Sequence, residues 1–105
     1  MATFISIVKA AKVAGFLEDF FNRTENTGGK MTCEARRVDN DLVQCDLHFT
    51  PTMDNLSVIA NTKGIAEANG QTGIGATIYF AGWKGKLKVC EYKWDIYSRT
   101  VSRIK

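Results

Sequence analysis

The sequence predicts an α+β domain in which an N-terminal helix packs on an antiparallel sheet built from two β-hairpins, in the order α-β-β-(α)-β-β. Three observations predict this fold class: helical spacing of apolar residues over 4–24, a period of two over 31–49, and a second alternating region over 76–97. With 105 residues, the chain has room for one hydrophobic core, so residues 1–105 form a single domain. An apolar fraction of 45% beside 24% charged residues is ordinary for a globular chain.

The first predicted helix runs from residue 4 to about residue 24, with Thr3 as its cap and Gly28-Gly29 as its end. Its core-facing residues follow the three-and-four spacing of one helical face: Ile7, Ala10, Ala14, Leu17 and Phe21. Further apolar residues lie outside this stripe, beside the polar side: Phe4, Ile5, Val8 and Phe16. Either the chain's own sheet wraps them or the helix also meets a second chain. We favour the first explanation, because Phe16 sits beside Phe20 and can widen the core-facing side.

The region 31–49 has the alternation of a β-hairpin, with Asp-Asn of the VDND segment supplying the turn. A loop centred on Asn40 places the odd-numbered residues of both strands on one face. Cys33 and Cys45 then become close neighbours on the buried side of the sheet.

Residues 50–75 fit two structures. Thr52 or Asp54 can cap a short helix over 53–63 that ends at Lys63-Gly64, and this is the structure we predict. The runner-up is an additional strand over 56–60 in a small bent sheet or half-barrel. The GQTGIG segment that follows is expected to be a flexible connector. A phosphate-binding loop would precede a helix, whereas here a strand follows.

The last predicted hairpin joins 76–81 to 87–97 through the GWKGK turn. Its alternation slips between Val89 and Cys90, which predicts a β-bulge there. Tyr92 and Trp94 are then core aromatics, and Trp83 is an exposed indole at the turn. The outer face of the first part carries a lysine row: Lys84, Lys86 and Lys88.

No catalytic constellation is evident in the pattern of reactive residues. The single histidine, His48, shares strand parity with Asp46 and is opposite in parity to Cys45, so a Cys-His nucleophilic pair within this strand is disfavoured. The three cysteines lack CxxC spacing, and with one histidine they do not predict a zinc site. We therefore expect a protein that is not an enzyme and that has no metal and no cofactor.

The apolar N-terminal stretch does not predict a membrane span, because Lys9 and Lys12 interrupt it. An odd number of cysteines is typical of free thiols, and the expected location is the cytoplasm. The net charge is +3, and residues 53–105 hold most of the excess of basic side chains. This distribution is compatible with an acidic partner but does not require one.

The sequence predicts two alternative functions from different classes. The leading hypothesis is a small non-catalytic protein-interaction module, such as an inhibitor, an adaptor or an assembly subunit, that can also self-associate. Its expected interaction residues are Phe4, Ile5, Val8, Phe16 and Trp83. The alternative is a single-stranded nucleic-acid-binding protein that uses the basic, aromatic C-terminal hairpin. Its expected residues are Trp83, Lys84, Lys86, Lys88, Lys93, Arg99 and Arg103.

Overall fold

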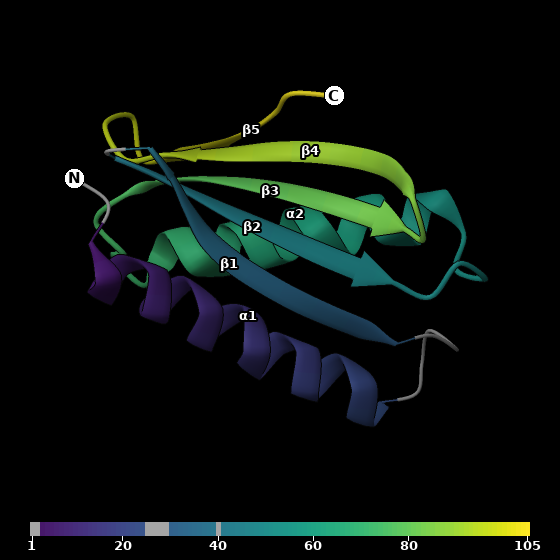
Figure 1. Cartoon of the computed structure of the whole chain (residues 1–105). Coiled ribbons are helices and arrows are strands. Elements are labelled where there is room, and N and C mark those ends of the chain that lie inside the picture. Colours follow the sequence, from purple (N-terminus) through teal and green to yellow (C-terminus); the bar gives the residue numbers. More distant parts are fainter. Residues whose placement is uncertain (1–2, 25–29, 40) are drawn as a thin grey trace.

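The computed structural model describes residues 3–24, 30–39 and 41–105, which form an α+β fold (Figure 1). The elements in chain order are helix α1 (Phe4–Thr24), strands β1 (Met31–Asp39) and β2 (Leu42–Phe49), helix α2 (Asn55–Gln71), and strands β3 (Thr77–Lys84), β4 (Leu87–Asp95) and β5 (Thr100–Arg103). The predicted helix end at Gly28-Gly29 and the turn residue Asn40 lie outside the described residues.

The five strands form one sheet in the order β1-β2-β3-β4-β5. Neighbouring strands are antiparallel except at the centre, where β2 and β3 run parallel. A parallel pair needs a long crossover, and α2 supplies it. The predicted α+β class and the two hairpins are confirmed. The hairpins join through this parallel pair rather than an antiparallel one, and the short β5 is a strand that the sequence analysis did not predict.

Helix α1 begins where predicted, because the Thr3 hydroxyl accepts a hydrogen bond from the Ser6 backbone N–H at 3.1 Å. Its inner side packs on β1 and β2 through the predicted stripe, with Ala10 and Ala14 fully buried. The expectation that the sheet would also wrap Phe16 is wrong, since Phe16 and Phe20 are both exposed. At about 100° per residue, Phe16 lies well over 90° around the helix from either alanine, so it points away from the side of α1 that packs on the sheet.

Helix α2 is longer than predicted. Of the two caps that the sequence allowed, Asp54 is the one used, and it accepts a hydrogen bond from the Ser57 backbone N–H at 2.8 Å. The predicted end at Lys63-Gly64 is wrong, and so is the strand over 56–60, because the helix continues to Gln71. A glycine within a helix weakens it by only about 1 kcal/mol, and the packing of α2 on β3 and β4 offsets that loss.

Both helices lie on one face of the sheet, which places the hydrophobic core between the helices and the strands (Figure 1). The odd-numbered residues of β2 are buried there, and Cys33 and Cys45 lie on this side, as predicted. The bulge in β4 is also confirmed. Gly82 pairs with Cys90 while Trp83 pairs with Lys88, so Val89 is the extra residue. The other face of the sheet is covered by neither helix.

Candidate functional site

The outer side of α1 is one of two surfaces that fit a functional role. Phe4, Ile5, Phe16 and Phe20 expose 80%, 64%, 71% and 62% of their surfaces, and Val8 is half-buried beside them. We call these five residues the helix face. Phe20 was not among the predicted interaction residues, although its spacing of four from Phe16 would have placed it on the same side of the helix.

Charged residues lie among the apolar residues of the helix face. Lys9 and Lys12 are exposed in the N-terminal half of α1. Asp19 and Arg23 are exposed in the C-terminal half, where they form an ion pair at 2.9 Å. The outer side of α1 is therefore a mixed apolar and charged surface, with basic residues in its N-terminal half and an acid–base pair in its C-terminal half.

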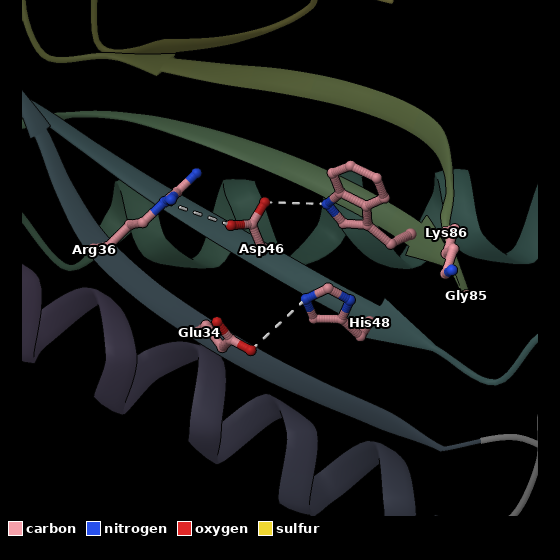
Figure 2. Close-up of a pocket in the computed structure, with 7 residues that line it drawn as sticks. Glu34, Arg36, Asp46, His48, Gly85 and Lys86 are labelled. Carbon is pink, nitrogen blue, oxygen red and sulfur yellow. Dashed lines mark hydrogen bonds and ion pairs between the residues drawn. The ribbon is translucent and has the colours of Figure 1, made fainter.

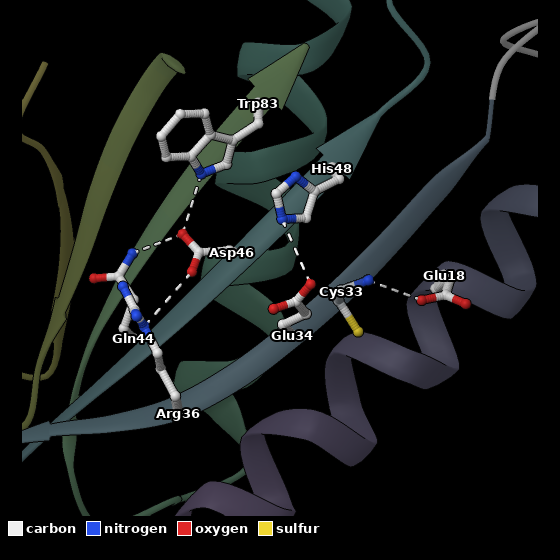
Figure 3. Close-up of polar contacts among 8 residues, drawn as sticks. All are labelled: Glu18, Cys33, Glu34, Arg36, Gln44, Asp46, His48 and Trp83. Carbon is white, nitrogen blue, oxygen red and sulfur yellow. Dashed lines mark hydrogen bonds and ion pairs between the residues drawn. The ribbon is translucent and has the colours of Figure 1, made fainter. Parts of the chain in front are cut away.

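The second surface is a polar cluster on the open face of the sheet, centred on Asp46 of β2 (Figure 3). The Asp46 side chain is only 14% exposed. One of its carboxylate oxygens accepts hydrogen bonds from Trp83 Nε1 at 3.1 Å and from Gln44 Nε2 at 3.0 Å. The other lies 3.9 Å from Arg36 Nε. These donors from three strands hold the carboxylate in place.

The Trp83 indole lies beside residues of both neighbouring strands, which corrects the prediction of an exposed indole at the turn. Trp83 belongs to β3, and it is half-buried. The His48 ring stacks beside it with a centroid separation of 6.2 Å and an interplanar angle of 22°. The Lys88 ammonium lies 5.2 Å from the centroid of the indole ring. These neighbours leave the indole half-buried rather than free at the turn.

Next to this cluster is a shallow hollow of about 430 Å³ (Figure 2). Its lining residues are Glu34, Arg36, Asp46, His48, Trp83, Gly85 and Lys86. His48 Nε2 lies 4.0 Å from a Glu34 carboxylate oxygen. The lining contains the acidic residues Glu34 and Asp46 together with basic residues such as Arg36 and Lys86. Because both signs of charge are present, the hollow does not select an anion or a cation by charge alone.

The structure does not align the predicted basic residues along one track. Lys84 Nζ donates to Asn55 Oδ1 at 2.9 Å, so this lysine lies against the start of α2 rather than in a row with Lys86 and Lys88. Lys88 lies 3.6 Å from Glu91, and Lys93 lies 4.0 Å from Asp95.

The remaining two predicted basic residues lie near β5. Arg99 occupies the turn before this strand with a φ of 57°. Arg103 pairs with Tyr92, and because opposite residues of an antiparallel pair share a face, it lies on the helix side of the sheet. Of the predicted set, only Trp83, Lys86, Lys88 and Lys93 lie at the open face or its rim.

The three cysteines are free thiols with raised pKa values. Burial raises the pKa of Cys33 to about 11, and the neighbouring Glu18 carboxylate contributes to the rise. Burial also raises the pKa of Cys45 and of Cys90. Since the thiolate is the reactive form, none of these side chains has the environment of a nucleophile.

Within the described ranges, no group of three or more histidine, cysteine or carboxylate side chains is placed to hold a metal ion. Neither helix, over its described residues, has the length and hydropathy needed to cross a membrane. Comparison with protein-family models, with curated proteins and with solved structures finds no match to this chain. The helix face and the polar cluster around Asp46 are therefore the two candidate functional surfaces.

Proposed function

We propose that this protein is a small protein-interaction module, an inhibitor, an adaptor or an assembly subunit, that binds its partner through the helix face of α1. The observation that supports this proposal is the exposure of three phenylalanines and an isoleucine on one side of one helix. Large apolar side chains gathered on one surface are typical of contact sites, and aromatic residues dominate the binding energy of such sites.

The architecture also fits this proposal. The inner side of α1 is anchored on β1 and β2 by small, fully buried residues such as Ala10 and Ala14. A helix fixed in this way presents its outer side chains on a rigid support, which lowers the entropy lost on binding. The free thiols fit the expected cytoplasmic location, where thiols stay reduced.

The experiment that tests this function compares two serine variants as bait. The first is the double variant F16S/F20S on the helix face. The matched control is L56S on α2, since Leu56 is also exposed, at 78%, but lies away from the helix face. We expect the wild-type chain and L56S to retain one defined partner, and F16S/F20S to lose it, with unchanged circular dichroism in all three.

The captured partner must then bind the purified wild-type chain with the same dependence on the two phenylalanines. Equal binding by F16S/F20S and the wild type would show that the helix face is not the contact site. The proposal would then be wrong for this surface.

A second candidate function is single-stranded nucleic-acid binding on the open face of the sheet. The observation that favours it is the pair of near-parallel rings, Trp83 and His48, with Lys86 and Lys88 beside them. Basic side chains around stacking rings are the requirement for such binding. Against it stand the ion pair of Lys88 with Glu91 and the half-buried position of the indole.

The test of the second function is fluorescence anisotropy of a labelled oligonucleotide at two salt concentrations. Binding that weakens as salt rises, is lost in K86E/K88E and is retained in the control K84E would support the open face as the site. Absence of binding at low salt would exclude it.

A further inference from the structure

Six exposed residues of α1 form a line along the outer side of the helix, which we call the seam. They are Ile5, Lys9, Lys12, Phe16, Asp19 and Arg23. Their spacing alternates four and three residues, which is the spacing at which one helix presents a continuous row of side chains to a second helix. The row extends for about 27 Å at 1.5 Å per residue. Within the described parts of the chain, no other helix or strand covers it (Figure 1).

We propose that the seam is the contact between two copies of this chain, which pair through α1 in antiparallel orientation. This inference rests on the proposed function and names the partner of the helix face as a second copy. Ile5 and Phe16 are exposed apolar residues of the kind that helix pairs bury, and the charged residues between them can set the orientation of the pair.

The order of charges along the seam selects the antiparallel orientation. When the twofold axis crosses the seam at the height of residue 14, Lys9 of one copy lies opposite Asp19 of the partner subunit, and symmetry repeats this pair at the other end. Each Asp19 keeps its ion pair with Arg23 of its own copy and gains the lysine as a second cationic neighbour. A parallel pair would instead place each lysine against its own counterpart, and like charges in contact oppose association. Antiparallel helices also align their dipoles favourably.

The remaining seam residues complement one another in the same orientation. Lys12 lies opposite Phe16 of the partner subunit, and an ammonium over a phenyl ring is a favourable cation–π contact. Ile5 lies opposite Arg23 of the partner subunit, whose aliphatic stem can cover an apolar side chain. Phe20 flanks the seam and adds apolar surface at its edge. The seam is thus self-complementary along its length, as a twofold interface requires.

The placement of the charged residues also argues against a lipid surface as the occupant. A helix that lies on a membrane buries an apolar side in the lipid and carries its basic residues on the opposite, polar side. Here Lys9, Lys12, Asp19 and Arg23 lie on the same line as Ile5 and Phe16. The row therefore cannot enter lipid without taking charged side chains with it.

The experiment measures molar mass by light scattering across a concentration series. We expect the wild-type chain to approach twice its 11.7 kDa. K9E places an acidic side chain opposite Asp19, and D19K places a basic side chain opposite Lys9. Because symmetry repeats each repulsion, each single variant should raise the dimer dissociation constant at least about tenfold. F16S/F20S should do the same through lost apolar contact.

Combining the two charge reversals tests directly whether positions 9 and 19 face each other. A mixture of K9E and D19K should form heterodimers, since each acidic position then faces a basic one. The double variant K9E/D19K should regain the homodimer for the same reason. The matched control is K63E, which reverses an exposed charge on α2 and should leave the dimer unchanged. Circular dichroism confirms that each variant remains folded.

The outcomes separate this inference from the proposed function. A wild-type mass of 11.7 kDa at every concentration shows that the partner is not a second copy. The proposed function stands in that case if the binding of another protein requires Phe16 and Phe20. A monomer that instead sediments with phosphatidylglycerol vesicles, and loses this in F16S/F20S, overturns both. A dimer that K9E, D19K and F16S/F20S leave intact uses another surface, which also overturns the antiparallel α1 pair.

Discussion

Two glycines of α2 have opposite roles although they lie on the same helix. A Cβ atom at Gly70 would come within 2.5 Å of Trp94 Cε3, whereas a Cβ atom at Gly64 would meet nothing within 4 Å. Gly70 therefore allows the helix to approach the indole ring of β4 closely. Gly64 has no such contact, and its lack of a side chain only weakens the helix.

This contrast predicts opposite effects on stability. G70A should lower the free energy of unfolding by about 1–3 kcal/mol, because Trp94 must move out of its packed position. G64A should raise it by up to about 1 kcal/mol through improved helix propensity. Urea denaturation of the two variants checks the prediction, and equal effects would show that Gly70 is not in close contact with the ring.

Cys33 gives a second prediction for individual residues, because its thiol reactivity depends on the carboxylate beside it. With the pKa of Cys33 near 11, roughly one thousandth of the thiol is ionised at pH 8, so reaction with a disulfide reagent should be slow. E18Q removes the negative charge that helps to raise the pKa of Cys33. The pKa should then fall, and the reaction at pH 8 should become faster.

The control for Cys33 is E67Q, which removes an exposed negative charge from α2 that does not contribute to the pKa of Cys33. The amide oxygen introduced by E18Q can still accept a hydrogen bond from the Cys33 backbone N–H, as Glu18 does at 3.0 Å, so the fold should be retained. Equal rates for E18Q and E67Q would contradict the role assigned to Glu18.

The raised pKa of Cys33 also predicts that stability falls as pH rises from 9 toward 11, since the unfolded thiol ionises first.

Among the elements, α2 depends on a single well-defined cap. Asp54 accepts hydrogen bonds from the backbone N–H and from the hydroxyl of Ser57, both at 2.8 Å, and these bonds lower the pKa of Asp54. The only crossover between the parallel strands therefore begins at a fixed position. Strand β3 follows this helix, so the start of α2 helps to set where β3 enters the sheet.

We predict that D54A lowers the midpoint of thermal unfolding at pH 7, whereas D54N retains most of the wild-type value, because asparagine is also a good cap. The lowered pKa fixes the sign of the pH dependence. The advantage of the wild type over D54A should be present above the usual pKa of an aspartate and should disappear as pH falls through the lowered value. Thermal scans at pH 7 and at strongly acidic pH measure it.

In the whole molecule, apolar side chains divide between a core and an unused outer surface. Phe80 of β3 is fully buried beneath the helices, whereas Phe20 is mostly exposed. F80A should therefore cost about 3–5 kcal/mol of unfolding free energy, and F20A should change it by no more than about 0.5 kcal/mol. Chemical denaturation at a concentration that keeps the chain monomeric checks both. A large loss in F20A would mean that Phe20 belongs to the core.

The sequence alone determined the two hairpins, the start of α1 and the sides of the strands, but neither β5 nor the extent of α2. The Thr3 cap, the alternation over 31–49 and the slip at Val89 were each sufficient, because they depend on neighbours within a few residues. For α2, the sequence allowed either Thr52 or Asp54 as the cap. The spacing of the apolar residues along α1 also showed that this helix carries more of them than one core-facing stripe needs.

Only the tertiary structure decided how those elements combine. The parallel pairing of β2 with β3 depends on where α2 carries the chain, and the length of α2 depends on packing against β3 and β4. The half-buried position of Trp83 depends on His48 of β2 and on Lys88 of β4. A periodicity within a segment indicates which face of a strand or helix each residue occupies. These tertiary contacts instead join residues that are far apart in the chain, so no pattern within one segment specifies them.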